Sequence, residues 1–165
     1  MMLSQKMEKA LNEQINKEMY ASYLYLSISA WAESENWRGA KHWFALQAKE
    51  EIGHAMKIYK YVFERGNRVK LAAIEQPQSE FKGLADVFAK ALDHEKMVTG
   101  SIHKLVELAA AETDHATSIF LQYFVTEQVE EEANASEMLA HLERIGDSKQ
   151  GLYMLDNVLS KRSAD

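Results

Sequence analysis

Residues that break helices are scarce along this chain. Only one proline and seven glycines occur among its 165 residues, and no segment alternates apolar and polar residues as a half-buried β-strand does. Long helices are therefore expected. The breaks in the pattern divide them into residues 3–33, 37–65, 84–111, 115–145 and 149–160. Gly66 predicts the end of the second helix, and Thr113 or Asp114 predicts the start of the fourth.

Two short turns and one long connection, which holds the only proline, join the four long helices. The connection of about 17 residues spans roughly 55 Å when extended, whereas a helix of about 28 residues is about 42 Å long. It can therefore cross the whole bundle, although a loop that returns at the same end also satisfies the sequence. We expect an all-α single domain over residues 1–165, a four-helix bundle with a long crossover between helices two and three and a short fifth C-terminal helix.

Each long helix has a stripe of mostly apolar residues, spaced alternately three and four apart, that is expected to face the core. A glutamate interrupts each stripe near its middle. The second helix contributes Glu51 and His54, and the other three contribute Glu18, Glu95 and Glu131. Counted from the short turns, the acids of each antiparallel pair lie at matching heights. If helices two and three run parallel, all four carboxylates and the imidazole converge in one layer.

Such a layer is unfavourable without a counter-charge, because desolvation and mutual repulsion both oppose ionisation of the carboxyl groups. Two divalent cations bridged by carboxylates would neutralise it. The chain has no cysteine, which removes thiolate sites, disulfides and iron–sulfur clusters. Carboxylates with one histidine suit Fe(II) or Mn(II) better than structural zinc. Glu51 and His54, at i and i+3, also match the paired-ligand spacing of di-iron carboxylate bundles.

Together these motifs resemble those of the bacterial non-haem ferritins over essentially the whole chain. The segments that carry the resemblance are NKEMYASYLYLS, KEEIGHA, HEKMVTGSI and TEQVEEEANAS. The resemblance implies a ferritin-like bundle with a ferroxidase centre, in which two iron ions are bridged by Glu51. It assigns the other ligands as follows: Glu18 and His54 on the first iron, and Glu95 and Glu131 on the second, with Gln128 nearby.

In this family Fe(II) is bound, oxidised by dioxygen or hydrogen peroxide, and stored as a ferric mineral inside a hollow shell of 24 subunits. The resemblance also implies a third iron position, which Glu50, Glu127 and Glu130 match, with Glu131 shared. The alternative for the run EQVEEE is an ordinary solvated helix face. Ile52 stands where bacterioferritins have a haem-binding methionine, so no haem is expected.

Tyr25 lies seven residues after Glu18 on the same stripe. It is a candidate catalytic residue that could hydrogen-bond a site carboxylate or donate an electron, and a buried core tyrosine is the alternative. The other histidines lack paired spacing and are interpreted as surface or packing residues: His42, His94, His103, His115 and His141.

Apolar residues cover several faces of residues 20–31 and one side of the fifth segment. Such surfaces predict subunit interfaces and therefore a homo-oligomer, of 24 subunits by the resemblance. The net charge is -6, and no basic cluster exceeds two residues, which argues against a nucleic-acid partner.

We expect no membrane contact and a cytoplasmic location, because the chain lacks an apolar span of roughly 20 residues and a signal-peptide core. The alternative function is a non-redox structural or interaction bundle whose central acids bind no redox metal.

Overall fold

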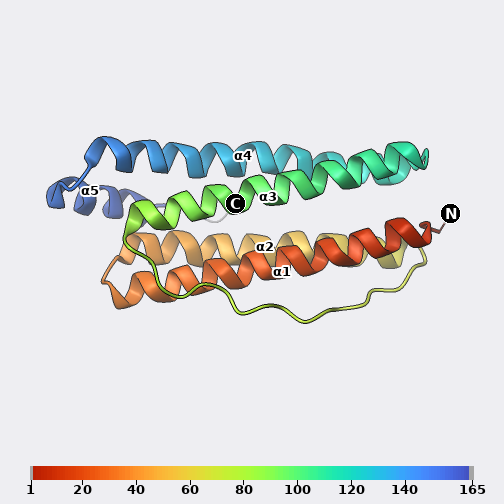
Figure 1. The fold of residues 1–165 in the computed structure, drawn as a ribbon, viewed down its shortest axis with the longest axis horizontal. Helices are drawn as coiled ribbons and strands as arrows, with labels where there is room; N and C mark the ends of the chain where they lie inside the picture. The colour runs from red at the N-terminus through yellow and green to blue at the C-terminus, as the bar shows by residue number, and fades with distance from the viewer. Residues whose placement is uncertain (1, 164–165) are drawn as a thin grey trace.

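The computed structural model describes residues 2–163, and within that range the chain forms five α-helices and no strand (Figure 1). These are α1 Gln5–Ser34, α2 Arg38–Glu64, α3 Leu84–Ala111, α4 His115–Ile145 and α5 Lys149–Leu159. The long helices pack as two antiparallel pairs, α1 with α2 and α3 with α4, and α5 packs beside α2 at one end. The expected four-helix bundle with a short fifth helix is confirmed.

The helix ends follow local capping chemistry. Helix α1 begins after Ser4, later than the expected residue 3, because the Ser4 hydroxyl accepts the Met7 N–H at 3.0 Å and caps the first turn. Asp114 caps α4 by accepting the Thr117 N–H at 3.1 Å. Gly66 follows the end of α2 with φ of 75°, a left-handed conformation that favours glycine.

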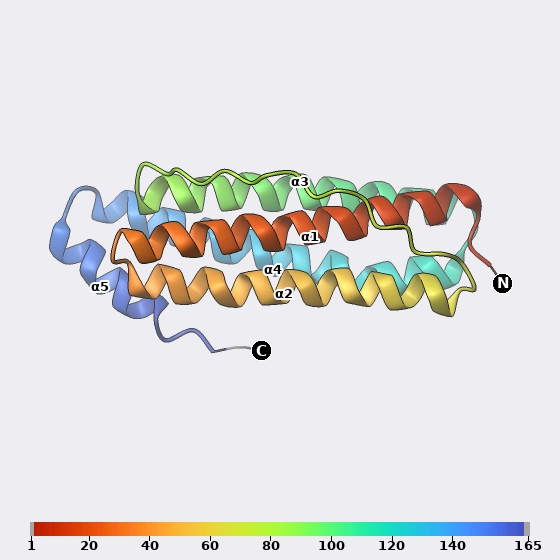
Figure 2. The ribbon, with the colours of Figure 1, turned by 90° about the horizontal axis from the view of Figure 1, so that it is seen from below.

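The connection between α2 and α3 runs the length of the bundle beside α1, so α2 and α3 are parallel (Figures 1 and 2). The expected crossover is therefore correct. Three polar side chains of α1 form hydrogen bonds with the backbone of this connection: Asn12 with Lys70, Asn16 with Ala73 and Ser27 with Gln78. These bonds hold an extended segment that has no helix or sheet of its own.

Helix α5 is fixed to the start of α2 by a very close backbone approach. A Cβ atom on Gly39 would lie 1.7 Å from the backbone oxygen of Asp156, so this position has no room for a side chain. The Asp156 carboxylate also accepts the Ala40 N–H at 2.9 Å. A glycine in α2 thus decides where the last helix lies.

Among the described residues, two apolar clusters form the core, one at each end of the bundle. Phe44 and Phe88 lie in the cluster next to α5, and Ile58 and Phe124 lie in the cluster at the opposite end. The central acids of the four stripes fall between these clusters. The bundle is therefore apolar at both ends and polar in the middle. None of the helices within residues 2–163 is both long and apolar enough to span a membrane.

Candidate metal centre

Each of the four long helices sends one central acid into the polar layer. Glu18 of α1, Glu51 of α2, Glu95 of α3 and Glu131 of α4 are all buried, and α2 adds the buried His54. The antiparallel pairing of the helices sets the acids of each pair at one height, and the crossover aligns the two pairs. All five predicted groups therefore lie inside the bundle.

Three of these groups come together most closely. Glu18, Glu51 and His54 each offer one ligand atom, and these atoms all lie within 4.8 Å of one another. The Nδ1 atom of His54 is 3.2 Å from a carboxylate oxygen of Glu51. The Oε2 atom of Glu18 is buried and has no hydrogen-bond partner among the described residues. An unpartnered buried carboxylate oxygen is costly, and a cation beside it would satisfy it.

The other half of the layer contains Glu95 and Glu131. The Tyr25 hydroxyl donates to one oxygen of Glu95, and Gln128 donates from Nε2 to the other at 3.1 Å. Gln47 joins the two halves, since its Nε2 donates to Glu131 at 2.7 Å and to Glu51 at 3.3 Å. Neutral amide and hydroxyl donors thus orient these carboxyl groups.

Burial and mutual repulsion raise the pKa values of these acids. Burial, with repulsion from Glu51, raises the pKa of Glu18 to about 8. Burial, with repulsion from Glu95, raises the pKa of Glu131 to about 7. The pKa of Glu51 is also raised, well above its ordinary range, by burial and by the other carboxylates. Such groups retain protons near neutral pH unless a cation replaces them.

The residues matched to a third iron position lie toward the edge of the layer. Glu127 is half-buried, and one of its carboxylate oxygens is 3.5 Å from the Nε2 atom of His54. Glu50 is also half-buried and forms an ion pair with Arg162, whose Nη2 lies 2.6 Å from its carboxylate. Glu130 is exposed on α4, three residues after Glu127.

Two amides beside the acids, Gln14 and Gln47, were not predicted from the sequence to belong to the site, unlike Gln128. Gln14 donates to Glu18 at 2.7 Å, and Gln47 stands in the same relation to Glu51. Each amide lies four residues before its glutamate, which is a spacing that the sequence displays. Arg162 was also missed, and nothing in the sequence places it near α2.

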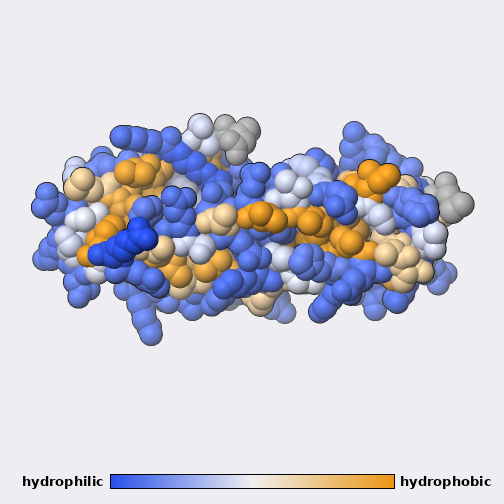
Figure 3. Space-filling view, turned by 90° about the horizontal axis from the view of Figure 1, so that it is seen from above, coloured by the Kyte–Doolittle hydropathy of each residue, from blue (hydrophilic) through white to orange (hydrophobic). Residues whose placement is uncertain are grey.

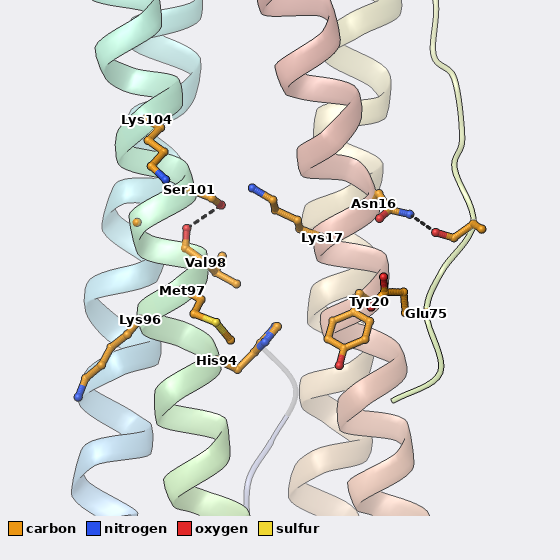
Figure 4. A pocket seen from close by; sticks show the side chains of 12 residues that line it. Asn16, Lys17, Tyr20, Glu75, His94, Lys96, Met97, Val98, Ser101 and Lys104 are labelled. Atoms are coloured by element: carbon orange, nitrogen blue, oxygen red, sulfur yellow. Dashed lines mark hydrogen bonds between the residues drawn. The ribbon is translucent and has the colours of Figure 1, made fainter. Parts of the chain in front are cut away.

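His94 follows the expectation of a packing residue. Its ring is buried between Tyr20 and Tyr25, and burial lowers its pKa to about 4. It also lines a groove of about 610 Å³ between α1 and α3, where Tyr20 faces it from α1 (Figure 4). This groove lies outside the carboxylate layer.

The fold and the layer define a class of protein, the four-helix bundles that place carboxylates and histidine around metal ions. A family model described as "Ferritin-like domain" matches residues 8–145. A bacterial non-heme ferritin of Campylobacter jejuni is 43% identical over 158 residues, which covers 96% of this chain and 95% of that protein. A bacterial non-heme ferritin of Staphylococcus aureus is 37% identical over 164 residues, 99% of both chains.

Solved structures agree with these sequence relatives. An open-pore ferritin from the archaeon Archaeoglobus fulgidus superimposes with a TM-score of 0.97 at 47% identity, over 98% of both chains. A closed form engineered from that ferritin gives 0.97 at 46% identity over 99% of both chains. This chain belongs to the ferritin family. It is an iron-storage protein, and the resemblance seen in its sequence motifs is confirmed.

Proposed function

We propose that this ferritin oxidises Fe(II) at a di-iron ferroxidase centre in the polar layer and stores the product as a ferric mineral. One observation carries the proposal: a buried group of Glu18, Glu51 and His54 with an unpartnered carboxylate oxygen. Structural packing does not explain such a group, because acids are poor core residues unless they are paired or bind a cation.

Glu51 occupies the place suited to a bridging ligand. It lies next to His54, and Gln47 links it to Glu131 on the opposite helix pair. We assign Glu18 and His54 to a first iron, and Glu95 and Glu131 to a second. Four carboxylates would then balance the charge of two divalent ions.

The remaining residues support this pair. Tyr25 and Gln128 both donate to Glu95, so we assign them the role of orienting that ligand. A third iron position at the edge of the layer would use these carboxylates: Glu50, Glu127 and Glu130, with Glu131 shared.

The chemistry balances with two iron ions. Each Fe(II) loses one electron, and the two electrons are taken up together with two protons. They convert one dioxygen to one hydrogen peroxide, or one hydrogen peroxide to two water molecules. The carboxylates favour Fe(III) over Fe(II), because hard anionic oxygen ligands stabilise the higher charge. The Fe(III) ions are then transferred to the ferric mineral.

Storage of a ferric mineral requires an enclosed cavity, and we propose that 24 copies of this chain form a closed shell around it. Large apolar side chains remain exposed on this chain, among them Ile119 and Val129 on α4 and Tyr153 and Met154 on α5. Figure 3 shows apolar surface along the middle of one face and near its left end. Exposed apolar surface of this extent is typical of subunit contacts.

Stopped-flow absorbance tests the ferroxidase assignment. After anaerobic loading with Fe(II), mixing with oxygen should give a fast ferric phase in the parent protein. Glu18→Gln should lose that phase, whereas Glu137→Gln, at an exposed position of α4, should keep it. If Fe(II) oxidises in the parent only as fast as in buffer and precipitates, the chain is a structural bundle and the proposal fails.

A further inference from the structure

The segment that follows α5 continues beside α2 toward the middle of the bundle (Figure 2). Its Arg162 reaches four residues on successive turns of that helix. The guanidinium lies 4.4 Å from the ring centroid of Trp43, and the Arg162 backbone oxygen is 2.9 Å from the Nε2 atom of His42. Two further contacts, to Gln47 and Glu50, connect the segment to the candidate metal centre.

The contact with Gln47 fixes the direction of its amide. Arg162 donates from Nη1 to the Gln47 oxygen at 2.7 Å. A guanidinium has only donors, so it can bond only the oxygen end of the amide. The amide nitrogen then faces Glu51 and Glu131 and donates to both. Arg162 thus keeps Gln47 as a hydrogen-bond donor to the centre and turns its oxygen away from the carboxylates.

The contact with Glu50 places a positive charge where a metal ion is expected. Nη2 of Arg162 is 2.6 Å from Glu50, and the two side chains are only 18% and 29% exposed. A short, partly sheltered guanidinium–carboxylate pair is stronger than an ordinary surface pair. The guanidinium bonds the Oε2 atom of Glu50, so a cation that binds this oxygen competes with Arg162 for it.

We propose that Arg162 is a positioning residue, a tethered counter-cation that occupies Glu50 until a metal ion displaces it. Filling of the third position is then coupled to release of the C-terminal segment from α2. Removal of Arg162 should raise the metal affinity of this position, and the gain should depend on Glu50. The inference rests on the proposed function, since it assumes that Glu50 binds metal.

Anaerobic calorimetric titration with Fe(II) tests the proposal on the assembled protein. We expect Arg162→Gln to bind Fe(II) about three- to tenfold more tightly at the weakest class of sites, the range set by the strength of partly exposed ion pairs. Lys161→Gln is the matched control, because it removes the same charge from the exposed neighbouring residue. It should leave that affinity within about twofold of the parent, as expected for a screened surface charge.

A double-mutant cycle isolates the contact. In a Glu50→Gln background, Arg162→Gln should no longer change the affinity of the weak sites. Hydrogen exchange supplies a readout other than binding: in the parent, Fe(II) at the weak sites should speed exchange in the peptide after α5. Arg162→Lys keeps the charge but lacks the rigid fork of donors that bonds Gln47 and Glu50 at once, and it should give an intermediate affinity.

The outcomes separate the two proposals. If the parent binds Fe(II) tightly at the central pair but Arg162→Gln matches it at every site, Arg162 does not compete with metal and this inference is wrong. The inference is also wrong if neither the parent nor Arg162→Gln shows a third class of Fe(II) sites in the titration. If the parent binds no Fe(II) at the central pair, the proposed function itself fails. Should Arg162→Gln not form the oligomer of the parent, Arg162→Lys carries the same comparison.

Discussion

At the scale of single residues, neutral groups hold the central acids in place. Gln14 donates to Glu18, and Ser101 in turn donates to the Gln14 oxygen at 2.7 Å, so this amide has a fixed direction. The Gln47 amide is likewise given a fixed direction, because Arg162 donates to its oxygen. Amide and hydroxyl donors orient carboxylates without cancelling their charge. The orientation of these acids is therefore set by neighbouring side chains.

Replacement of Glu95 separates the structural role of the acid from its chemical role. Glu95→Leu removes a crowded carboxylate, but it leaves the fully buried Tyr25 hydroxyl without its acceptor. An unsatisfied buried hydroxyl costs about 1–3 kcal/mol. We expect metal-free Glu95→Leu to melt earlier than the double variant Glu95→Leu with Tyr25→Phe, as measured by calorimetry on chelator-treated protein.

Both variants should lose the fast phase of Fe(II) oxidation, because the second iron lacks a ligand. Survival of that phase in either variant would show that Glu95 does not bind iron. Tyr25→Phe alone is the control, and it should retain a measurable fast phase.

The raised pKa values predict proton release on metal binding. The pKa values of Glu18, about 8, and Glu131, about 7, imply that the metal-free centre holds protons at pH 6.5. Fe(II) must displace them. Anaerobic calorimetry in buffers of different ionisation enthalpy should therefore detect proton release at pH 6.5 and less release above pH 8. Release that is independent of pH would contradict the assignment.

The raised pKa values also determine whether the stability of the metal-free protein rises or falls with pH. The pKa of Glu18 rises from 4.5 to about 8 on folding, so between these pH values the folded state binds more protons than the unfolded state. The contribution of Glu18 to stability should then fall as pH rises through this window and level off above it. Denaturant unfolding of chelator-treated protein measures this effect, and Glu18→Gln should make the dependence weaker.

At the scale of helices, local chemistry sets the ends and a few tertiary contacts set the placement. Ser4 and Asp114 cap their helices through side chains close in sequence. The crossover between α2 and α3 instead follows α1, because α1 side chains such as Asn12 and Asn16 form hydrogen bonds with the crossover backbone. The close approach of α5 depends on Gly39, because a Cβ at this position would overlap the backbone of Asp156.

Substitution at Gly39 should therefore loosen α5. The added Cβ of Gly39→Ala would overlap the Asp156 backbone oxygen, and overpacking of this kind costs about 1–3 kcal/mol. Gly100→Ala is the matched control, because nothing lies within 4 Å of its added Cβ and alanine favours a helix by about 1 kcal/mol. We expect Gly39→Ala to lower the melting temperature and speed hydrogen exchange in α5, and Gly100→Ala to do neither.

At the scale of the whole molecule, the chain leaves apolar surface that one bundle does not cover. On α5, Leu155 and Leu159 are buried against the bundle, whereas Tyr153, Met154 and Val158 remain exposed. A helix with apolar residues on both sides is typical of an element that contacts the bundle on one face and another subunit on the other.

A charge on the outer face of α5 should therefore impair assembly without unfolding the bundle. Met154 is 61% exposed in the single chain, and Met154→Lys should yield smaller species in sedimentation velocity with helical circular dichroism retained. Gln150→Lys, at an exposed polar position of the same helix, should assemble as the parent does. If the parent itself sediments as a monomer or dimer, the shell is wrong.

The sequence determined the helices, their inward stripes and the height of each central acid, because helical periodicity and a few breakers act locally. It thereby predicted that Glu18, Glu51, His54, Glu95 and Glu131 would be buried in one layer. Only the tertiary structure decided which groups surround them. The contact of Arg162 with Gln47 spans 115 residues and that of Asp156 with Ala40 spans 116, and no periodic pattern encodes such pairs. Their partners depend on how α5 packs, which is decided by the fit of two backbones at Gly39.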